Sequence, residues 1–248
     1  MDTKINEKFL GLWEKYFDGA ELPMVFYYTD EAREVEVVKP CSGHKCIFAD
    51  LSKVRAGKSL CFGAESIGCF GGKRYLGFTD EVMPDFEYFL SYGIPGKLEG
   101  ERYKKTPKLV KEIMERMPEF KAPGRFIVFK RWDMLEEIDE PDVVTFFAQP
   151  DVLSGLFTVA NFDEAEPNAV FAPFGAGCGS IVRYPYLEKA SERPRAVLGL
   201  FDVSARPFVP KEALSFSVPM VKFMRMVENM EESFLTTRSW SKVRQRIQ

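Results

Sequence analysis

The stretch DVVTFFAQPDVLSGLFTVA, residues 142–160, decides the fold class. Residues 142–149 form an apolar, β-branched and aromatic run of strand length, which predicts a buried strand. From Pro150 to Ala160 the apolar residues recur at spacings of three and four, which predicts a helix. These apolar positions are Val152, Leu153, Leu156, Phe157 and Val159. A buried strand followed at once by a helix indicates a protein that mixes both kinds of element.

The same two patterns alternate along the rest of the chain. Further strands are expected at 22–28, 34–38, 59–63, 73–79, 125–132, 168–174 and 195–204. Helices are expected at 4–18, at about 50–57, within a helical insertion at 81–118, and at 217–235. We therefore predict an α+β (mixed α/β) fold in a single compact domain over residues 1–248.

The two halves of the chain carry a faint internal echo. In the first half a strand is followed by Cys69 and then by YLGFTD at 75–80. In the second half a strand is followed by Cys178 and then by VLGLFD at 197–202. This order suggests pseudo-repeated halves at 20–80 and 142–204, which would bring the two cysteine loops to a shared crevice.

Composition and charge argue against several classes of protein. The net charge of the 248 residues is −3, which does not suit a nucleic-acid-binding surface. The N-terminal stretch is charged and amphipathic, unlike a secretory signal, and no apolar run reaches the roughly 18 residues that span a membrane. We expect a cytoplasmic protein with five reduced cysteines. Its expected partner is a small-molecule ligand rather than nucleic acid or membrane, and the sequence leaves open whether it is a homodimer.

Cysteines gather in the first third of the chain. Cys41, Cys46, Cys61 and Cys69 are spaced C-x4-C-x14-C-x7-C, with His44, the only histidine, between the first two. Thiolate and imidazole are ligands for zinc or an iron–sulfur cluster. The candidate metal ligands are Cys46, Cys61, Cys69 and Cys178, and the candidate cofactor is a metal ion or iron–sulfur cluster. The spacing fits neither a zinc ribbon nor a ferredoxin, so buried structural thiols are the alternative.

Two glycine-flanked cysteines are candidates for chemistry. In GCFGGK, residues 68–73, glycines after the cysteine allow a turn that presents N–H groups to an anion. In FGAGCGS, residues 174–180, small residues surround Cys178 as in a nucleophile elbow, for which His44 would be the base. The segment IVRYPY after Cys178 suggests extended structure, which weakens the elbow. The candidate ligand-binding residues are Cys69, Gly71, Gly72, Gly175, Gly177, Cys178 and Arg206.

Several segments together resemble a known family. They are CFGAESIGCFGGKRYLGF, FLSYG, ERYKKTPKLV, FAPFGAGCGS and VLGLFDVSARP, in this order. This combination resembles the uncharacterised family called domain of unknown function 169, over about residues 20–235. The resemblance implies a prokaryotic cytoplasmic protein and no established activity. It places emphasis on the positions occupied by Cys69, Gly71, Gly72, Cys178, Asp202 and Arg206.

Three functions compete on these residues, and the sequence does not decide among them. The first is a metal- or redox-linked protein in which Cys69 and Cys178 meet. The second is a small-molecule-binding module without chemistry, whose aromatic residues and Arg206 would form the pocket. The third is a cysteine-dependent hydrolase or transferase that uses Cys178 and His44.

Overall fold

The computed structural model describes residues 3–32, 34–40 and 43–247, so Cys41 lies outside the described residues. The strands are β1 (Met24–Thr29), β2 (Glu36–Val37), β3 (Leu60–Gly63), β4 (Phe126–Arg131), β5 (Val143–Ala148), β6 (Val170–Phe171), β7 (Ala196–Gly199) and β8 (Leu214–Pro219). The helices are α1 (Thr3–Phe17), α2 (Ile47–Arg55), α3 (Phe70–Tyr75), α4 (Phe86–Phe89), α5 (Pro107–Arg116), α6 (Pro150–Ala160), α7 (Tyr184–Glu188), α8 (Met220–Asn229) and α9 (Arg238–Arg244). A π-helix, η3 (Gly179–Arg183), runs directly into α7.

Within the described residues, eight strands form one mixed sheet in the order β2-β3-β4-β1-β5-β8-β7-β6. The predicted α+β fold is confirmed, and so is the strand-to-helix junction at Pro150. This proline occupies the first turn of α6, where its missing N–H is not needed by the helix. Strands β5 and β1 lie at the centre, and all six residues of β5 are buried.

The sheet repeats one arrangement of four strands. Read from one edge inward the order is β2-β3-β4-β1, and read from the other edge inward it is β6-β7-β8-β5. In both units the outermost pair is parallel and the other pairs are antiparallel. The units meet through antiparallel β1 and β5. Each unit includes a fourth strand, β4 or β8, that the expected repeats at 20–80 and 142–204 leave out; duplication itself stays a prediction.

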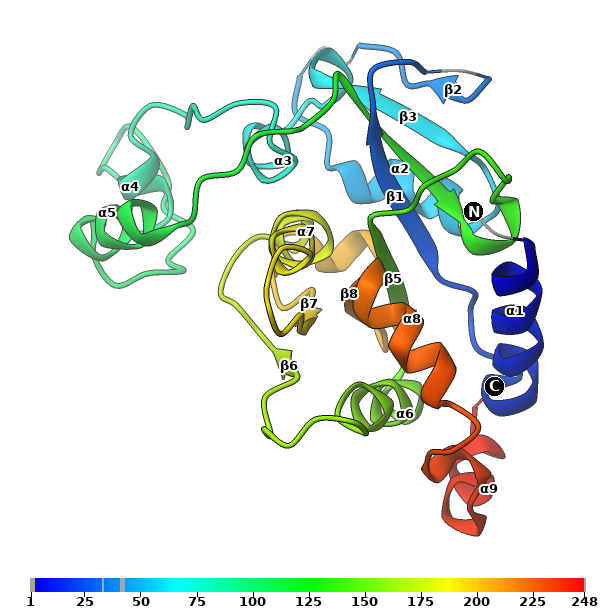
Figure 1. Ribbon diagram of the computed structural model, residues 1–248. Coiled ribbons are helices and arrows are strands. Elements are labelled where there is room, and N and C mark those ends of the chain that lie inside the picture. Colours follow the sequence, from blue (N-terminus) through cyan, green and yellow to red (C-terminus); the bar gives the residue numbers. More distant parts are fainter. Residues whose placement is uncertain (1–2, 33, 41–42, 248) are drawn as a thin grey trace.

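Helices cover both faces of the sheet (Figure 1). One face packs against α1, α6, α8 and α9 in a large aromatic core that contains Phe9, Trp13, Phe146 and Trp240. The other face packs against α2, α3, η3 and α7 in a second core that contains Phe48, Phe129, Cys178 and Ile181. Among the described residues, no helix is both long enough and apolar enough to pass through a lipid bilayer.

An arm formed by residues 78–121 projects from the body and carries α4 and α5 (Figure 1). The two ends of the arm come together at its base, which we call the neck. There the N–H of Ala122 donates a backbone hydrogen bond of 2.9 Å to the carbonyl oxygen of Gly77. Gly77 has a φ of +80°, and a Cβ there would lie 2.5 Å from the nitrogen of Ala122, so only glycine fits. The arm contains the predicted insertion 81–118.

Three expected elements are wrong. The expected strand at 73–79 is instead the second half of α3 and a turn, because Leu76 and Tyr75 pack into the core beneath that helix. The segment IVRYPY is not extended but forms η3 and the start of α7, with Pro185 in its first turn. The helix expected from 217 begins only at Met220, because Ser217 belongs to β8 and pairs with Thr145.

Candidate functional site

Two segments of the described chain share the pattern Cys-x4-Arg-Tyr. GCFGGKRY spans 68–75 and GCGSIVRY spans 177–184. Each begins a helical element at its cysteine: Cys69 precedes α3 and Cys178 precedes η3. This repeat was readable in the sequence, although the expected echo aligned the segments that follow these cysteines instead.

Glycines in both segments serve close packing rather than an anion-binding turn. Gly71 and Gly72 are helical, without the positive φ that the predicted turn requires. The N–H of Gly72 instead donates to Sγ of Cys69 at 3.4 Å, which caps the helix. A Cβ on Gly179 would lie 2.6 Å from a ring carbon of Tyr75, so α3 rests directly on the turn after Cys178. Like positions of the two segments also lie near one another, because charges at Cys69, Arg74 and Tyr184 shift the pKa values of Cys178, Arg183 and Tyr75, respectively.

Cys178 is enclosed by groups from three further elements. A Cβ on Gly177 would lie 2.9 Å from both Phe48 and Leu200, so α2 and the end of β7 press on this loop. The N–H of Gly177 donates to the carboxylate of Asp202 at 3.0 Å. Cys46 immediately precedes α2, two residues before Phe48. Cys46, Cys69 and Asp202 lie near enough to Cys178 for their charges to act on it, and we call Cys46, Cys69, Cys178 and Asp202 the thiol cluster.

The electrostatics of the thiol cluster disfavour thiolates at its buried members. Burial raises the pKa of Cys178 well above its usual value, and the nearby charges of Cys69, Asp202 and Cys46 raise it further. Burial also raises the pKa of Cys46. Both groups are therefore protonated near neutral pH, whereas a nucleophilic cysteine needs its thiolate form. Cys69 and Cys46 are partly exposed, whereas Cys178 is buried.

Several predicted site residues do not join the thiol cluster. Cys61 is fully buried on the opposite face of the sheet beside Tyr27 and Val128, and burial raises its pKa to about 11. His44 is exposed, and no hydrogen bond joins it to Cys178 in the described chain. Among the described residues, no group of three or more His, Cys, Asp or Glu side chains is arranged to hold a metal ion. The four-cysteine metal site therefore lacks support.

Arg206 is committed to its own loop. Its guanidinium donates to the carbonyl oxygens of Ala213, Pro210 and Lys211. It forms no ion pair with Asp202 in the described chain, because Asp202 accepts instead from Gly177 and from the N–H and hydroxyl of Ser204. Arg206 holds the turn between β7 and β8, so the structure gives no support to its expected role as a ligand anchor.

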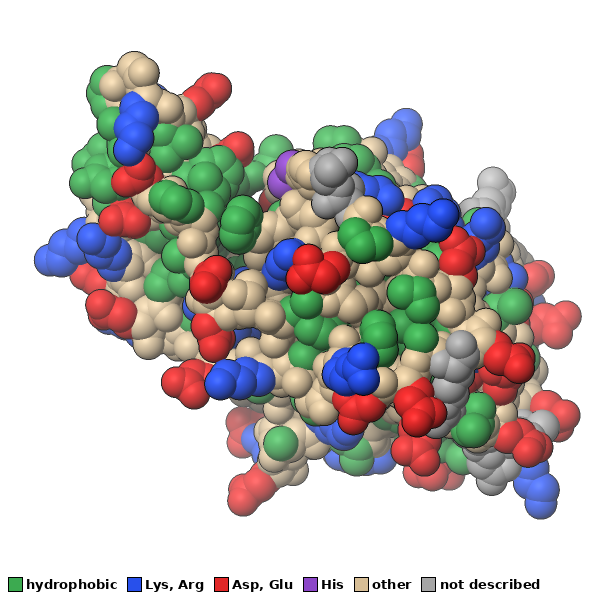
Figure 2. Space-filling model, turned by 90° about the horizontal axis from the view of Figure 1, so that it is seen from above, with side chains coloured by type: hydrophobic (Ala, Val, Ile, Leu, Met, Phe, Trp, Pro, Cys, Tyr) green, Lys and Arg blue, Asp and Glu red, His purple; other side chains and the backbone are tan. Residues whose placement is uncertain are grey.

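Exposed aromatic side chains flank the thiol cluster. Phe70 follows Cys69, Phe201 precedes Asp202, and Phe174 begins the loop of Cys178; each is more than half exposed. The arm reaches this rim: the ammonium of Lys104 lies 3.6 Å from the ring centre of Phe174, and Tyr103 hydrogen-bonds to Ser204. Figure 2 shows hydrophobic side chains on the lobe formed by the arm, and a surface that is hollowed between this lobe and the body.

Comparison with known proteins identifies a family and nothing closer. The model of a family described as uncharacterised ArCR, domain of unknown function 169, matches residues 15–229. No curated protein matches the chain. No solved structure matches it either. The matched range includes every residue of the thiol cluster.

Proposed function

We propose that this chain, which belongs to the domain of unknown function 169 family, is a thiol redox protein in which Cys69 and Cys178 form a reversible disulfide. The observation that supports the proposal is the packing of Tyr75 against Gly179, with Cys69 near enough to Cys178 for its charge to raise the pKa of Cys178. Partly exposed Cys69 would meet the oxidant, and buried Cys178 would act as the resolving thiol.

The reaction needs a small-molecule disulfide as oxidant. The thiolate of Cys69 attacks one sulfur of that disulfide and releases the other as a thiolate. Cys178 then loses its proton and attacks the sulfur of Cys69, which releases the second small thiol. The balance is one protein dithiol and one small disulfide in, one protein disulfide and two small thiols out. Neighbouring Asp202 and Cys46 oppose the ionisation of Cys178, so this second step is expected to be the slower one.

A redox titration tests this function. The protein is equilibrated with glutathione at a series of oxidised-to-reduced ratios, trapped with a maleimide, and digested for mass spectrometry. We expect one disulfide, between Cys69 and Cys178, with a single midpoint potential. Cys69→Ser should abolish it. Cys61→Ala is the matched control and should leave the midpoint unchanged, because Cys61 lies on the other sheet face.

Two results would count against the redox function. One is that both cysteines stay reduced at every ratio while circular dichroism reports a folded protein. The other is a disulfide that forms only after partial unfolding, because a bridge in the folded protein requires Cα atoms about 4.4–6.8 Å apart.

A second candidate is a small-molecule-binding protein without chemistry, which the exposed rim of Phe70, Phe174 and Phe201 favours. Exposed aromatic side chains around a hollow are typical of sites that bury an apolar ligand. The environment-sensitive dye anilinonaphthalene sulfonate should bind there. Phe201→Ser should then weaken dye binding, whereas Phe162→Ser, at an exposed phenylalanine just after α6, should not.

The thiol separates the two candidates. For a binding protein without chemistry, Cys178→Ala should keep the affinity for the dye within about tenfold, or ~1.4 kcal/mol. A binding protein also needs no midpoint potential in the glutathione titration. Equal dye binding by wild type, Phe201→Ser and Phe162→Ser would argue against a ligand site at the rim.

A further inference from the structure

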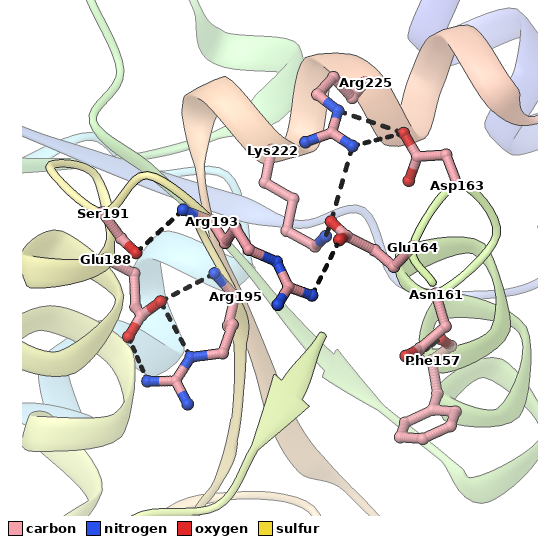
Figure 3. Close-up of polar contacts among 10 residues, drawn as sticks. All are labelled: Phe157, Asn161, Asp163, Glu164, Glu188, Ser191, Arg193, Arg195, Lys222 and Arg225. Atoms are coloured by element: carbon pink, nitrogen blue, oxygen red, sulfur yellow. Dashed lines mark hydrogen bonds and ion pairs between the residues drawn. The ribbon is translucent and has the colours of Figure 1, made fainter. Parts of the chain in front are cut away.

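Three cations are buried in the described part of the chain, and two of them pair with carboxylates. Lys130, 3% exposed, contacts Asp139 at 2.8 Å. Lys222, 1% exposed, contacts Glu164 at 2.9 Å. Figure 3 shows the surroundings of Lys222, where every cationic side chain drawn lies against an Asp or Glu. Such pairing is the rule, because an unpaired buried charge is costly.

Arg183 is the third buried cation and departs from this rule. It is only 3% exposed, yet no Asp or Glu of the described chain forms an ion pair with it. One of its terminal nitrogens donates to the carbonyl oxygen of Pro118, at the base of the arm. Its Nε is buried and has no hydrogen-bond partner among the described residues.

A second guanidinium lies near the first. Arg74 occupies the same position of the other Cys-x4-Arg-Tyr segment, and its Nε is likewise buried and without a partner in the described chain. Burial, and next the like charge of Arg74, lower the pKa of Arg183. The single carboxylate among its charged neighbours, Asp80, lies too far away to form an ion pair. Two cations with unused donors thus converge at the neck of the arm.

We propose that Arg74 and Arg183 form a binding site for the carboxylate or phosphate group of a small molecule. A guanidinium is the side chain best suited to an oxyanion, because its planar set of N–H donors matches two oxygen atoms at once. An oxyanion between the two guanidinium groups would satisfy both orphan Nε donors and remove the repulsion between like charges.

The place of this site in the fold gives it a use. In each segment the arginine follows the cysteine by five residues, so the bound oxyanion would lie one helical segment away from Cys69 and Cys178. Arg183 also ends a π-helix, an element that is frequently found at functional sites. The inference does not rest on the redox function, because the orphan donors are independent of the thiols.

Isothermal titration with sodium phosphate and with sodium malonate, at constant ionic strength set by sodium chloride, tests this site. We expect saturable binding of at least one of the two, and the stronger ligand identifies the oxyanion as phosphate-like or carboxylate-like. Arg74→Gln should weaken its affinity by about tenfold or more. Arg225→Gln removes the same charge from the cluster of Figure 3, and should leave the affinity unchanged. Cys69→Ser should also bind normally.

Arg183 gives a second readout that does not need tight binding. Because its charge is buried and forms no ion pair with a carboxylate of the described residues, Arg183→Met should fold without ligand and melt no lower than wild type. Phosphate or malonate should raise the melting temperature of wild type and not that of Arg183→Met. The proposal is overturned if neither anion binds saturably below about 20 mM, a concentration at which a site of millimolar affinity is filled, or if Arg225→Gln loses as much affinity as Arg74→Gln.

Discussion

The two halves of the sheet have the same arrangement of four strands and differ in the segments that connect those strands. In the first half Glu36 pairs with Leu60, and in the second half Val170 pairs with Ala196, at the same point of the parallel edge pair. Both third strands, β3 and β7, end in glycine. The connections to the fourth strands differ, because residues 64–125 include the arm whereas residues 200–213 form a short turn.

This difference explains how the thiol cluster is assembled. Cys46 and Cys178 occupy corresponding places, each just before the helical element that leads from the edge strand to the next strand. Cys69 has no such counterpart, because it lies in the long connection that only the first half possesses. The repeated four-strand arrangement therefore supplies Cys46 and Cys178. The long connection that only the first half possesses supplies Cys69 and Arg74.

Removal of the buried carboxylate of Asp139, which pairs with Lys130 of β4 in the first half, should have the largest effect on the free energy of unfolding. Asp139, 1% exposed, accepts hydrogen bonds from Tyr27, Lys130 and the N–H of Glu136. Asp139→Asn should lower the free energy of unfolding by about 3–5 kcal/mol, because the ammonium of Lys130 loses its buried counter-charge and keeps only the exposed carboxylate of Glu136. Denaturant unfolding measures it.

The matched change in the second half is Glu164→Gln beside Lys222. It should cost less than Asp139→Asn, because the carboxylate of Glu164 is 10% exposed and partly hydrated in the folded protein, whereas that of Asp139 is only 1% exposed. Equal losses would mean that the two buried lysines depend on their partners alike, and this contrast between the halves would be lost.

The paired glycines at the ends of β3 and β7 give the next largest effect. A Cβ on Gly199 would lie 2.1 Å from Cβ of Ser180, whereas a Cβ on Gly63 would lie 3.3 Å from the ring of Phe126. Gly199→Ala should cost about 2–3 kcal/mol in the free energy of unfolding, and Gly63→Ala less than about 1 kcal/mol. Similar losses of unfolding free energy for the two variants in urea titrations would show that the loop of Cys178 shifts to accommodate the added methyl group.

The rate of thiol modification should distinguish Cys69, in the long connection of the first half, from Cys61 and Cys178, which lie in the repeated strand arrangement. At neutral pH, iodoacetamide should modify Cys69 about tenfold faster than Cys178 or Cys61, because only Cys69 of these three combines exposure with a position at the rim. Peptide mass spectrometry over a time course gives the three rates. A Cys178 that reacted as fast as Cys69 would contradict its burial and restore the nucleophile hypothesis.

The pH dependence of stability should show the smallest effect. The pKa of Cys178 is raised in the folded state, so its contribution is intact below the ordinary thiol pKa of about 8.5 and is lost as the pH rises above it. The free energy of unfolding should therefore fall between about pH 8 and pH 9.5. Cys178→Ala should flatten this fall more than Cys46→Ala does, because the pKa shift of Cys178 is the larger one. An equal slope of unfolding free energy against pH in wild type, Cys178→Ala and Cys46→Ala would contradict the deeper burial of Cys178.

The sequence predicts the elements whose packing is local. The apolar run of β5 and the amphipathic face of α6 carry their own signals, and Pro150 marks the boundary between them. Strand β8 was missed because LSFSVP alternates serine with apolar residues. Those serines are buried, and the hydroxyl of Ser217 meets that of Thr145 at 3.0 Å, a pairing that only the assembled sheet provides.

The candidate site shows the limit of sequence reasoning more sharply. Two adjacent glycines argue against a helix at 70–75, yet α3 forms there. The helix packs so closely that a Cβ on Gly72 would approach Ile67 to 3.0 Å, which explains the glycine. Tertiary packing, rather than propensity, fixes that helix and with it Cys69 and Arg74. Cys61 shows the reverse case: it was grouped with other cysteines by spacing, but the alternation of a strand turns it to the far face.

The first helix has a consequence for synthesis of the chain. Phe9, Trp13 and Phe17 of α1 find their aromatic partners in Phe146, Phe223 and Trp240, and the indole N–H of Trp240 donates to the carbonyl oxygen of Tyr16 at 2.9 Å. A ribosome makes α1 well before Trp240, which follows Tyr16 by 224 residues. The aromatic face of α1 therefore lacks this partner until the intervening residues have been made.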